Sequence, residues 1–297
     1  MPVHLGISPI GWSNDDLPEL GGDIPLETCL AEARQAGFAG IELGNKFPCD
    51  PAALRPLLAG HGLALVSGWY GGRLLERSLT AEIEAVEPHL ALLAEMGCGV
   101  MVFAEISGSI AGDRQCPLSK RPRLGRGDWR DFGEAVTHLA EHLAERGVAM
   151  AYHHHHMGTV VEDVADIDRL MEVTGDSVGL LLDTGHLGFA GADPAAVAAR
   201  YRRRINHVHC KDLRSDVLQR VRATDASFLD AVLEGVFTVP GDGRIDFIGV
   251  LGALAPSYSG WLVVEAEQDP ATAPPLAYAR MGFAQLSAAM AKAGLAR

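Results

Sequence analysis

Short, nearly continuous apolar runs recur along the whole chain. Such runs are typical of parallel strands that are covered on both faces. Eight of them are predicted to be strands: Val3–Ser8, Ala39–Leu43, Leu63–Ser67, Gly99–Glu105, Gly147–His153, Val178–Thr184, Ile205–Cys210 and Trp261–Glu267. Most of these runs end in a polar or ionisable residue.

Stretches with helical character separate the first five runs, and each ends at a glycine. They are Pro25–Gly37, Asp50–Gly62, Leu79–Gly97 and Asp128–Gly147. A terminal glycine that leads into an apolar run predicts a left-handed helix cap before a strand. Pro88, inside the third stretch, predicts a kink or a helix start at that point.

Eight strand–helix units in succession predict an α/β protein with a (β/α)8 TIM barrel. We expect a single domain over residues 1–297. A doubly wound sheet is the alternative, but the chain lacks the glycine-rich phosphate-binding motifs GxGxxG after the first strand and GxxxxGK[ST]. Residues 106–127 and 211–246 are predicted to be long loops, which in a compact domain are often functional.

The composition and net charge of the chain limit which kinds of molecule it is expected to bind. The net charge is −13, which disfavours nucleic acid and anionic membranes as partners. The basic stretches Arg200–Arg204 and Ser119–Arg126 are interpreted as solvated. No signal peptide or membrane span is visible, and the five scattered cysteines are typical of reduced thiols, so we expect a cytoplasmic protein. The sequence leaves its oligomeric state open, and a homo-oligomer is one of the alternatives.

Polar side chains gather at the ends of the predicted strands. In a TIM barrel these ends form the active site. The residues concerned are Glu42, Ser67, Trp69, Glu105, His153–His156, Asp183, His186, His207, His209, Glu265 and Glu267. Imidazole and carboxylate groups that converge on one point predict a divalent metal site, with Mn, Co, Zn, Fe and Mg all open.

Several of these residues allow a structural interpretation as well. Asp183 precedes a helix-like stretch and could serve as its cap. His207 and His209 share one face of a strand, and His209, nearer the site, is the better candidate ligand. Glu265 follows a fully apolar run, where a carboxylate without a cation would be costly. Glu267 is predicted to lie on the rim or in a loop.

Longer motifs resemble a known superfamily. LLLDTGH, HVHCKD, VPGDGRIDF and GWLVVEAEQDP are similar to the xylose-isomerase-like barrels, which include sugar epimerases, inosose isomerases, dehydroshikimate dehydratases and, remotely, endonuclease IV. GISPIGWSNDDLPELGG, VSGWYGG, FAEISGSIAG and YHHHHMGT narrow the resemblance to the inosose dehydratase family of myo-inositol degradation. The resemblance covers essentially the whole chain.

This resemblance implies a divalent ion held by four groups after strands five to eight. Three of them correspond to Asp183, His209 and Glu265. The fourth is a glutamate in the sugar epimerases, and a histidine stands there in this chain. His154 is the first choice, with His156 or Glu162 as alternatives. Mn or Co is expected first, and the resemblance also raises glutathione as a cofactor to test.

The activity implied is a lyase reaction, the metal-dependent dehydration of scyllo-inosose (2-keto-myo-inositol), a cyclic polyol ketone, to a trihydroxycyclohexane-1,2-dione. The metal would polarise the ketone, and His186 would move the α-proton. Lys211 and Glu105 are expected to orient hydroxyls or stabilise oxyanions. The substrate-contacting residues are predicted to be His156, Trp12 and Trp69, the two tryptophans being equally compatible with the core.

Three other activities are weighed against dehydration. A metal-dependent sugar or inosose isomerase or epimerase needs the same enolate but no leaving group. A phosphodiesterase would need a basic groove, and the net charge of −13 disfavours it. A non-catalytic carbohydrate-binding protein would not require so many converging ionisable groups. The histidine run His153–His156 is interpreted as active-site rim rather than as a tag.

Overall fold

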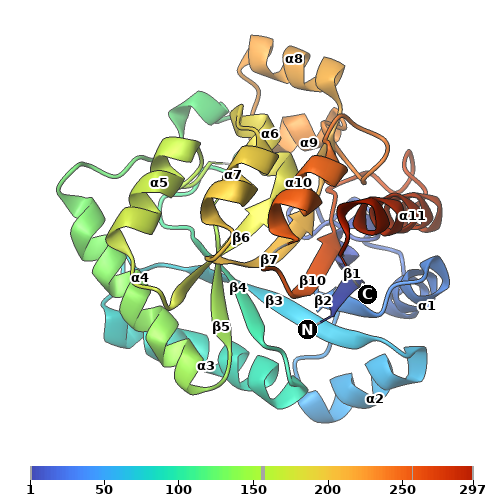
Figure 1. The fold of residues 1–297 in the computed structure, drawn as a ribbon, viewed down its shortest axis with the longest axis horizontal. Coiled ribbons are helices and arrows are strands. Elements are labelled where there is room, and N and C mark those ends of the chain that lie inside the picture. The colour runs from blue at the N-terminus through green and yellow to red at the C-terminus, as the bar shows by residue number, and fades with distance from the viewer. Residues whose placement is uncertain (1, 155–157, 256, 296–297) are drawn as a thin grey trace.

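The computed structural model describes residues 2–154, 158–255 and 257–295. Eight parallel strands close into a barrel in the order β1-β10-β7-β6-β5-β4-β3-β2, surrounded by helices (Figure 1). The barrel strands are β1 (Val3–Ile7), β2 (Gly40–Leu43), β3 (Ala64–Gly72), β4 (Val100–Glu105), β5 (Ala149–His153), β6 (Val178–Asp183), β7 (Ile205–Cys210) and β10 (Gly260–Val264). The predicted (β/α)8 barrel is therefore confirmed.

Helices follow the strands as the apolar pattern predicts. They are α1 (Leu26–Ala36), α2 (Pro51–His61), α3 (Leu79–Met96), α4 (Asp128–Glu145), α5 (Val164–Val173), α6 (Thr184–Ala190), α7 (Pro194–Tyr201), α8 (Ser215–Thr224), α9 (Phe228–Leu233), α10 (Phe247–Leu254) and α11 (Pro275–Ala293). The predicted glycine caps are left-handed, for example at Gly37 (φ 111°) and Gly62 (φ 65°). Helix α3 runs through Pro88 and does not start there.

Two apolar layers hold the barrel together. The larger layer lies between strands and helices and includes Leu30, Leu139 and Leu180, all fully buried. A smaller cluster, Val102, Ala151 and Leu181, comes from three adjacent strands. Successive side chains of a strand point to opposite faces, so residues two positions beyond these three share their direction. That rule decides which strand-end residues face one another.

The two predicted long loops differ. Residues 106–127 are mostly irregular, with one short 3-10 turn at Leu118–Lys120. Residues 211–246, the post-β7 segment, contain α8, α9 and an antiparallel pair of short strands, β8 (Asp212–Leu213) and β9 (Phe237–Thr238). The loop prediction is therefore wrong for the post-β7 segment, because its apolar residues bury one another in a cluster of their own.

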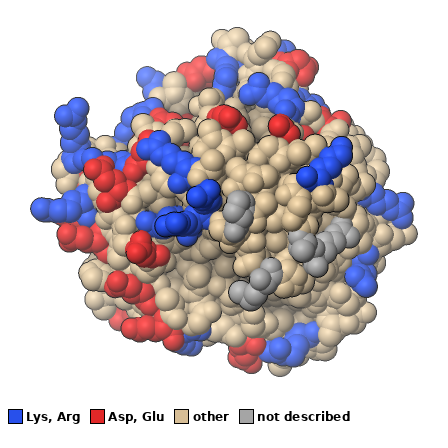
Figure 2. Space-filling model, in the orientation of Figure 1, with Lys and Arg blue, Asp and Glu red and all other residues tan. Residues whose placement is uncertain are grey.

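Charged side chains of both signs are interspersed on the face that Figure 2 shows, with uncharged surface between them. Two arginines from the basic stretches have partners within the protein. Arg200 pairs with Asp168 at 2.9 Å. Arg121 is buried, against expectation, and binds Asp163 and Asp166 at 3.0 and 2.6 Å. In the part of the chain that the structure describes, no helix is long and apolar enough to cross a membrane.

Candidate active site

A cavity of about 240 Å³ opens at the mouth of the barrel, where the strands end. Most of the strands, and the segment after β1, contribute to its wall. The lining includes Ser8, Asp15, Asp16, Glu42, Asn45, Trp69, Val102, His153, His186, His209, Glu265 and Glu267. The strand-end location matches the active-site position expected for a TIM barrel.

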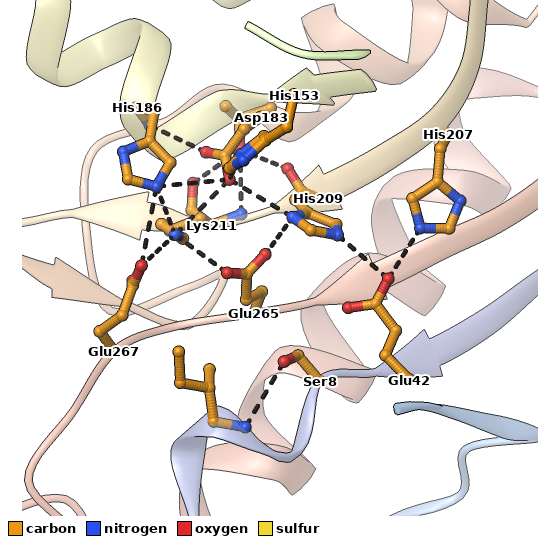
Figure 3. A network of polar contacts seen from close by, with 12 residues as sticks. Ser8, Glu42, His153, Asp183, His186, His207, His209, Lys211, Glu265 and Glu267 are labelled. Carbon is orange, nitrogen blue, oxygen red and sulfur yellow. Dashed lines mark hydrogen bonds and ion pairs between the residues drawn. The ribbon is translucent and has the colours of Figure 1, made fainter. Parts of the chain in front are cut away.

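Four ligand-type side chains meet on one side of this cavity (Figure 3). Asp183 Oδ2 lies 3.6 Å from both His153 Nε2 and His209 Nδ1. Glu265 Oε2 is in close contact with His209 Nδ1. Asp183 also caps α6, because its Oδ1 accepts the His186 backbone N–H at 2.8 Å. Helix cap and candidate ligand are thus two roles of one carboxylate, each served by a different oxygen.

The histidine beside Asp183 is His153, not the expected His154. His153 is two residues beyond Ala151, so its ring turns to the same side as the inner cluster. His154 points the other way, is buried, and its ring bonds the Leu181 backbone. The geometry therefore places His153, and not His154, beside Asp183 and makes it the candidate that we carry forward. His156 lies outside the described residues.

A buried ammonium group lies next to the candidate metal-ligand cluster. Lys211 Nζ lies 2.7 Å from Glu267 Oε1 and 2.8 Å from His186 Nε2. Glu265 Oε1 and Asp183 Oδ2 follow at 3.2 and 3.5 Å. Glu267 follows β10 in irregular structure, as the loop prediction expects, but it is only 4% exposed and is a buried partner of Lys211 that lines the cavity.

Opposite charges keep this cluster ionised although it is buried. Burial alone would raise the pKa of Asp183, but Lys211 and His186 outweigh it and hold that pKa well below its ordinary value. Burial would lower the pKa of His209, yet Glu265 and Glu42 raise it well above the usual range. Lys211 also has a raised pKa, because neighbouring carboxylates oppose the effect of burial.

Aromatic rings from the post-β7 segment cover the back of the site. The Phe237 ring lies 4.9 Å from that of His186, and Phe228 lies 6.1 Å from it, measured between ring centroids. Lys211 Nζ sits 4.9 Å from the centroid of Phe237. These contacts hold His186 and Lys211 in a dry environment and give the post-β7 segment a direct part in building the site.

Glu105 and Trp12, which were predicted to be site residues, lie away from the candidate cluster. Glu105 faces away from the inner cluster, and its carboxylate accepts the backbone N–H groups of Leu74 and Ser107 at 2.7 and 2.9 Å. Trp12 is in the hydrophobic core, where its indole N–H donates to Glu32.

Glu162, the remaining alternative ligand, pairs with Arg121 at 3.6 Å. By contrast, Trp69 is 45% exposed and lines the cavity, as expected of a residue that contacts substrate.

The cavity wall also holds residues to which the sequence analysis assigned no role. Asp15, Asp16 and Asn45 come from the segments that follow β1 and β2. Burial, then the negative charges of Glu267 and Asp15, raises the pKa of Asp16 to about 6. Two adjacent acids just beyond the first strand were the available signal, since strand-end loops supply barrel active sites.

The donor set fits a divalent cation. Asp183 Oδ2, His209 Nδ1 and Glu265 Oε2 lie within 4.8 Å of one another. Each is buried, and in the described chain none has a well-oriented hydrogen bond. Converging acceptor atoms of this kind are stabilised by a metal ion, and mixed imidazole and carboxylate ligands suit Mn, Fe, Co or Zn.

Comparison with known proteins places this geometry in context. The sequence model described as "Xylose isomerase-like TIM barrel" matches residues 30–288. The "Rhizopine catabolism protein MocC" of Rhizobium meliloti is 56% identical over 296 residues, covering 99% of this chain and 90% of the relative. The inosose dehydratase of Geobacillus thermodenitrificans is 48% identical, with coverages of 93% and 94%.

Solved structures agree on the fold. An L-ribulose 3-epimerase superposes with a TM-score of 0.70, covering 99% of this chain and 98% of that one, at 21% identity. A probable 3-DHS dehydratase from Bacillus anthracis superposes with a TM-score of 0.69 at 14% identity, covering 96% and 98%. At these identities the likeness concerns the barrel alone.

Proposed function

Because the chain belongs to the xylose isomerase-like TIM barrel family and to its inosose dehydratase group, we propose that it is a metal-dependent hydro-lyase that removes water from scyllo-inosose. The product would be a trihydroxycyclohexane-1,2-dione. The observation that carries the proposal is the buried group Asp183, His209 and Glu265, with His153 beside Asp183, at a cavity that His153, His209 and Glu265 line, in a chain 48% identical to an inosose dehydratase.

The four cluster residues would hold the ion at the substrate ketone. A divalent ion bound there supplies Lewis-acid polarisation of the ketone and stabilises the enolate charge, and we propose Mn or Co in this role. Glutathione remains part of the proposal as a second cofactor. Its test is the rate of the metal-loaded protein with and without added glutathione.

Proton transfer falls to His186 in this proposal. His186 lines the cavity, and its Nε2 lies 2.8 Å from Lys211 Nζ. The imidazole takes the α-proton of the ketone, and the β-hydroxyl then leaves as water with a proton returned from the same side. Lys211, paired with Glu267, keeps the ring in place and supplies positive charge next to it.

The remaining wall supplies recognition of a polyol ring. Carboxylates and an amide at the rim, Asp15, Asp16 and Asn45, can bond hydroxyl groups. Trp69 offers an apolar face on which the ring can pack. The substrate class proposed is therefore a small cyclic polyol ketone.

The decisive experiment is incubation of the metal-loaded protein with scyllo-inosose, followed by NMR. Dehydration predicts that two alcohol carbons of the substrate are lost, one becoming a methylene and the other a second carbonyl, and that an aromatic diamine traps the resulting dione. Interconversion of inososes without a dione would instead establish the isomerase alternative. Failure of any divalent metal to bind would contradict both, since each reaction needs the enolate to be stabilised.

A second candidate substrate comes from the relative named for rhizopine catabolism, which is 56% identical to this chain. Its higher identity favours a compound formed in rhizopine breakdown. Comparing kcat/KM for scyllo-inosose with that for rhizopine-derived ketones would decide between them. A preference of tenfold or more for either compound corresponds to about 1.4 kcal/mol in transition-state binding and would be decisive.

A further inference from the structure

Glu42 is a buried carboxylate for which the proposed reaction has no use. It is the next-to-last residue of β2 and is 6% exposed. Three groups converge on a single oxygen, Oε1: the Ser67 hydroxyl at 2.6 Å, His207 Nε2 at 2.9 Å and His209 Nε2 at 3.1 Å. Figure 3 shows Glu42 on the side of the His209 ring that faces away from Asp183.

The contact joins parts of the barrel that are not neighbours. Strands β1 and β10 stand between β2 and β7 in the barrel order, so Glu42 reaches His209 across the barrel interior. Ser67 on β3 and His207 on β7 hold the same oxygen and fix the carboxylate between them. A buried carboxylate held by three donors has little freedom to move.

These bonds determine which nitrogen of His209 keeps its proton when a metal ion binds. An ionised carboxylate only accepts hydrogen bonds, so His209 must present Nε2–H to Glu42. Its other nitrogen, Nδ1, then points at Asp183 Oδ2, 3.6 Å away, and at Glu265. When a divalent ion binds, Nδ1 loses its proton while Nε2–H remains bonded to Glu42, so that the Nδ1 lone pair is directed at the candidate metal position.

We propose that Glu42 is a positioning residue for the metal site: it fixes the orientation and tautomer of His209, so that Nδ1 is the ligand atom. Carboxylate–histidine–metal arrangements of this kind also make the imidazole a stronger donor. The inference rests on the proposed function, because the ion concerned is that of the proposed site. Glu42 itself does not bind the ion.

The test measures metal binding directly and needs no substrate. Glu42→Gln keeps the size of the side chain, but its amide can donate to Nε2 and allow the tautomer that blocks Nδ1. Isothermal titration with Mn²⁺ and with Co²⁺ should give a Kd raised about 10–100-fold over wild type. Glu82→Gln is the matched control, since Glu82 is a buried glutamate too but accepts hydrogen bonds from Tyr70 and Arg77 instead.

A spectroscopic readout keeps the test independent of folding in the variant. In Zn²⁺-loaded wild type with ¹⁵N-labelled histidine, NMR should show His209 protonated on Nε2 and metal-bound through Nδ1. The opposite tautomer would overturn the proposal even if Glu42→Gln failed to fold. Thermal unfolding of both Gln variants shows whether a weaker Kd reflects loss of structure.

The remaining outcomes separate this inference from the proposed function. An unchanged Kd in a folded Glu42→Gln protein would overturn the positioning role and leave the metal site intact. Two bound metal ions in wild type, with one lost in Glu42→Gln, would make Glu42 a ligand and overturn the inference. Absence of metal binding by wild type would overturn both. The positioning role of Glu42 is supported if the Kd for metal is raised in Glu42→Gln but not in Glu82→Gln, and if His209 has the expected tautomer.

Discussion

Two sides of the barrel mouth carry buried carboxylates whose side chains point in opposite directions. On the β6, β7 and β10 side, Asp183 and Glu265 turn toward the cavity and meet His209. On the β4 side, Glu105 is one residue out of phase with Ala104 and turns away, where backbone N–H groups hold it. A carboxylate at a strand end thus becomes a site residue only when its position along the strand has the correct parity.

The partners of these carboxylates also set their charge. Lys211 and then His186 hold the pKa of Asp183 well below its ordinary value despite burial. Glu105 has only neutral donors, so burial raises its pKa although the N–H bonds of Ser107 and Leu74 oppose this. The cavity side therefore holds permanent charges suited to a metal ion, and the β4 side holds a carboxylate that serves the backbone.

The largest expected effect is loss of the metal site on the cavity side. Asp183→Asn and Glu265→Gln should each lose bound Mn²⁺ or Co²⁺ on purification, because an anionic ligand is replaced by a neutral amide. Turnover should fall by more than the roughly 10²–10⁴-fold of a lost acid–base group. Elemental analysis checks occupancy, and full occupancy in both variants would refute the assignment.

Removal of the proton-transfer group should cost less and leave the ion in place. His186→Ala should lower kcat about 10²–10⁴-fold, with metal content unchanged, because His186 lines the cavity but moves a proton in the proposed mechanism. The measurements are steady-state kinetics and elemental analysis on the same sample. A normal kcat would show that a group other than His186 removes the α-proton.

The histidine run offers a comparison between adjacent residues. His153→Ala should weaken metal binding by about 10–100-fold or more, since its Nε2 lies 3.6 Å from Asp183 Oδ2. His154→Ala should change the Kd by less than about threefold, although it loses some stability through its buried ring. Metal titration of the two variants decides the order, and a stronger effect at His154 would reverse the assignment made here.

The smallest effect on turnover is expected on the β4 side. Glu105→Gln should leave metal affinity and kcat nearly unchanged and cost about 1–3 kcal/mol of stability, because one backbone N–H loses its carboxylate acceptor. The raised pKa of Glu105 favours folding at acidic pH, and this contribution is lost as pH rises through the folded-state pKa. Glu105→Gln should lack this pH-dependent contribution to stability, because the glutamine side chain does not titrate.

Unfolding temperatures of both proteins between about pH 4 and pH 7 test the sign of this effect. The loss of stability with rising pH that comes from Glu105 should be present in wild type and missing in Glu105→Gln. A large fall in kcat in the variant would restore Glu105 to the catalytic machinery.

Much of the architecture could be predicted from the apolar pattern. The recurrent buried runs and the glycine caps, such as those at Gly37 and Gly62, can be recognised in the sequence because each depends only on a few neighbouring residues. The post-β7 segment could not be predicted in this way. Its helices and β8–β9 pair bury mainly one another, and its contact with His186 through Phe237 joins residues far apart in the chain.

The sequence by itself determined the barrel, the strand-end location of the site and the set to which Asp183, His209 and Glu265 belong. Only the tertiary structure placed His153, rather than His154, beside Asp183 and brought Glu42 to His209 across the barrel. The physical reason is that side-chain direction alternates with every residue, so an error of one position inverts it. Contacts across a closed barrel depend, in addition, on which strands become neighbours, and no short stretch of sequence contains that information.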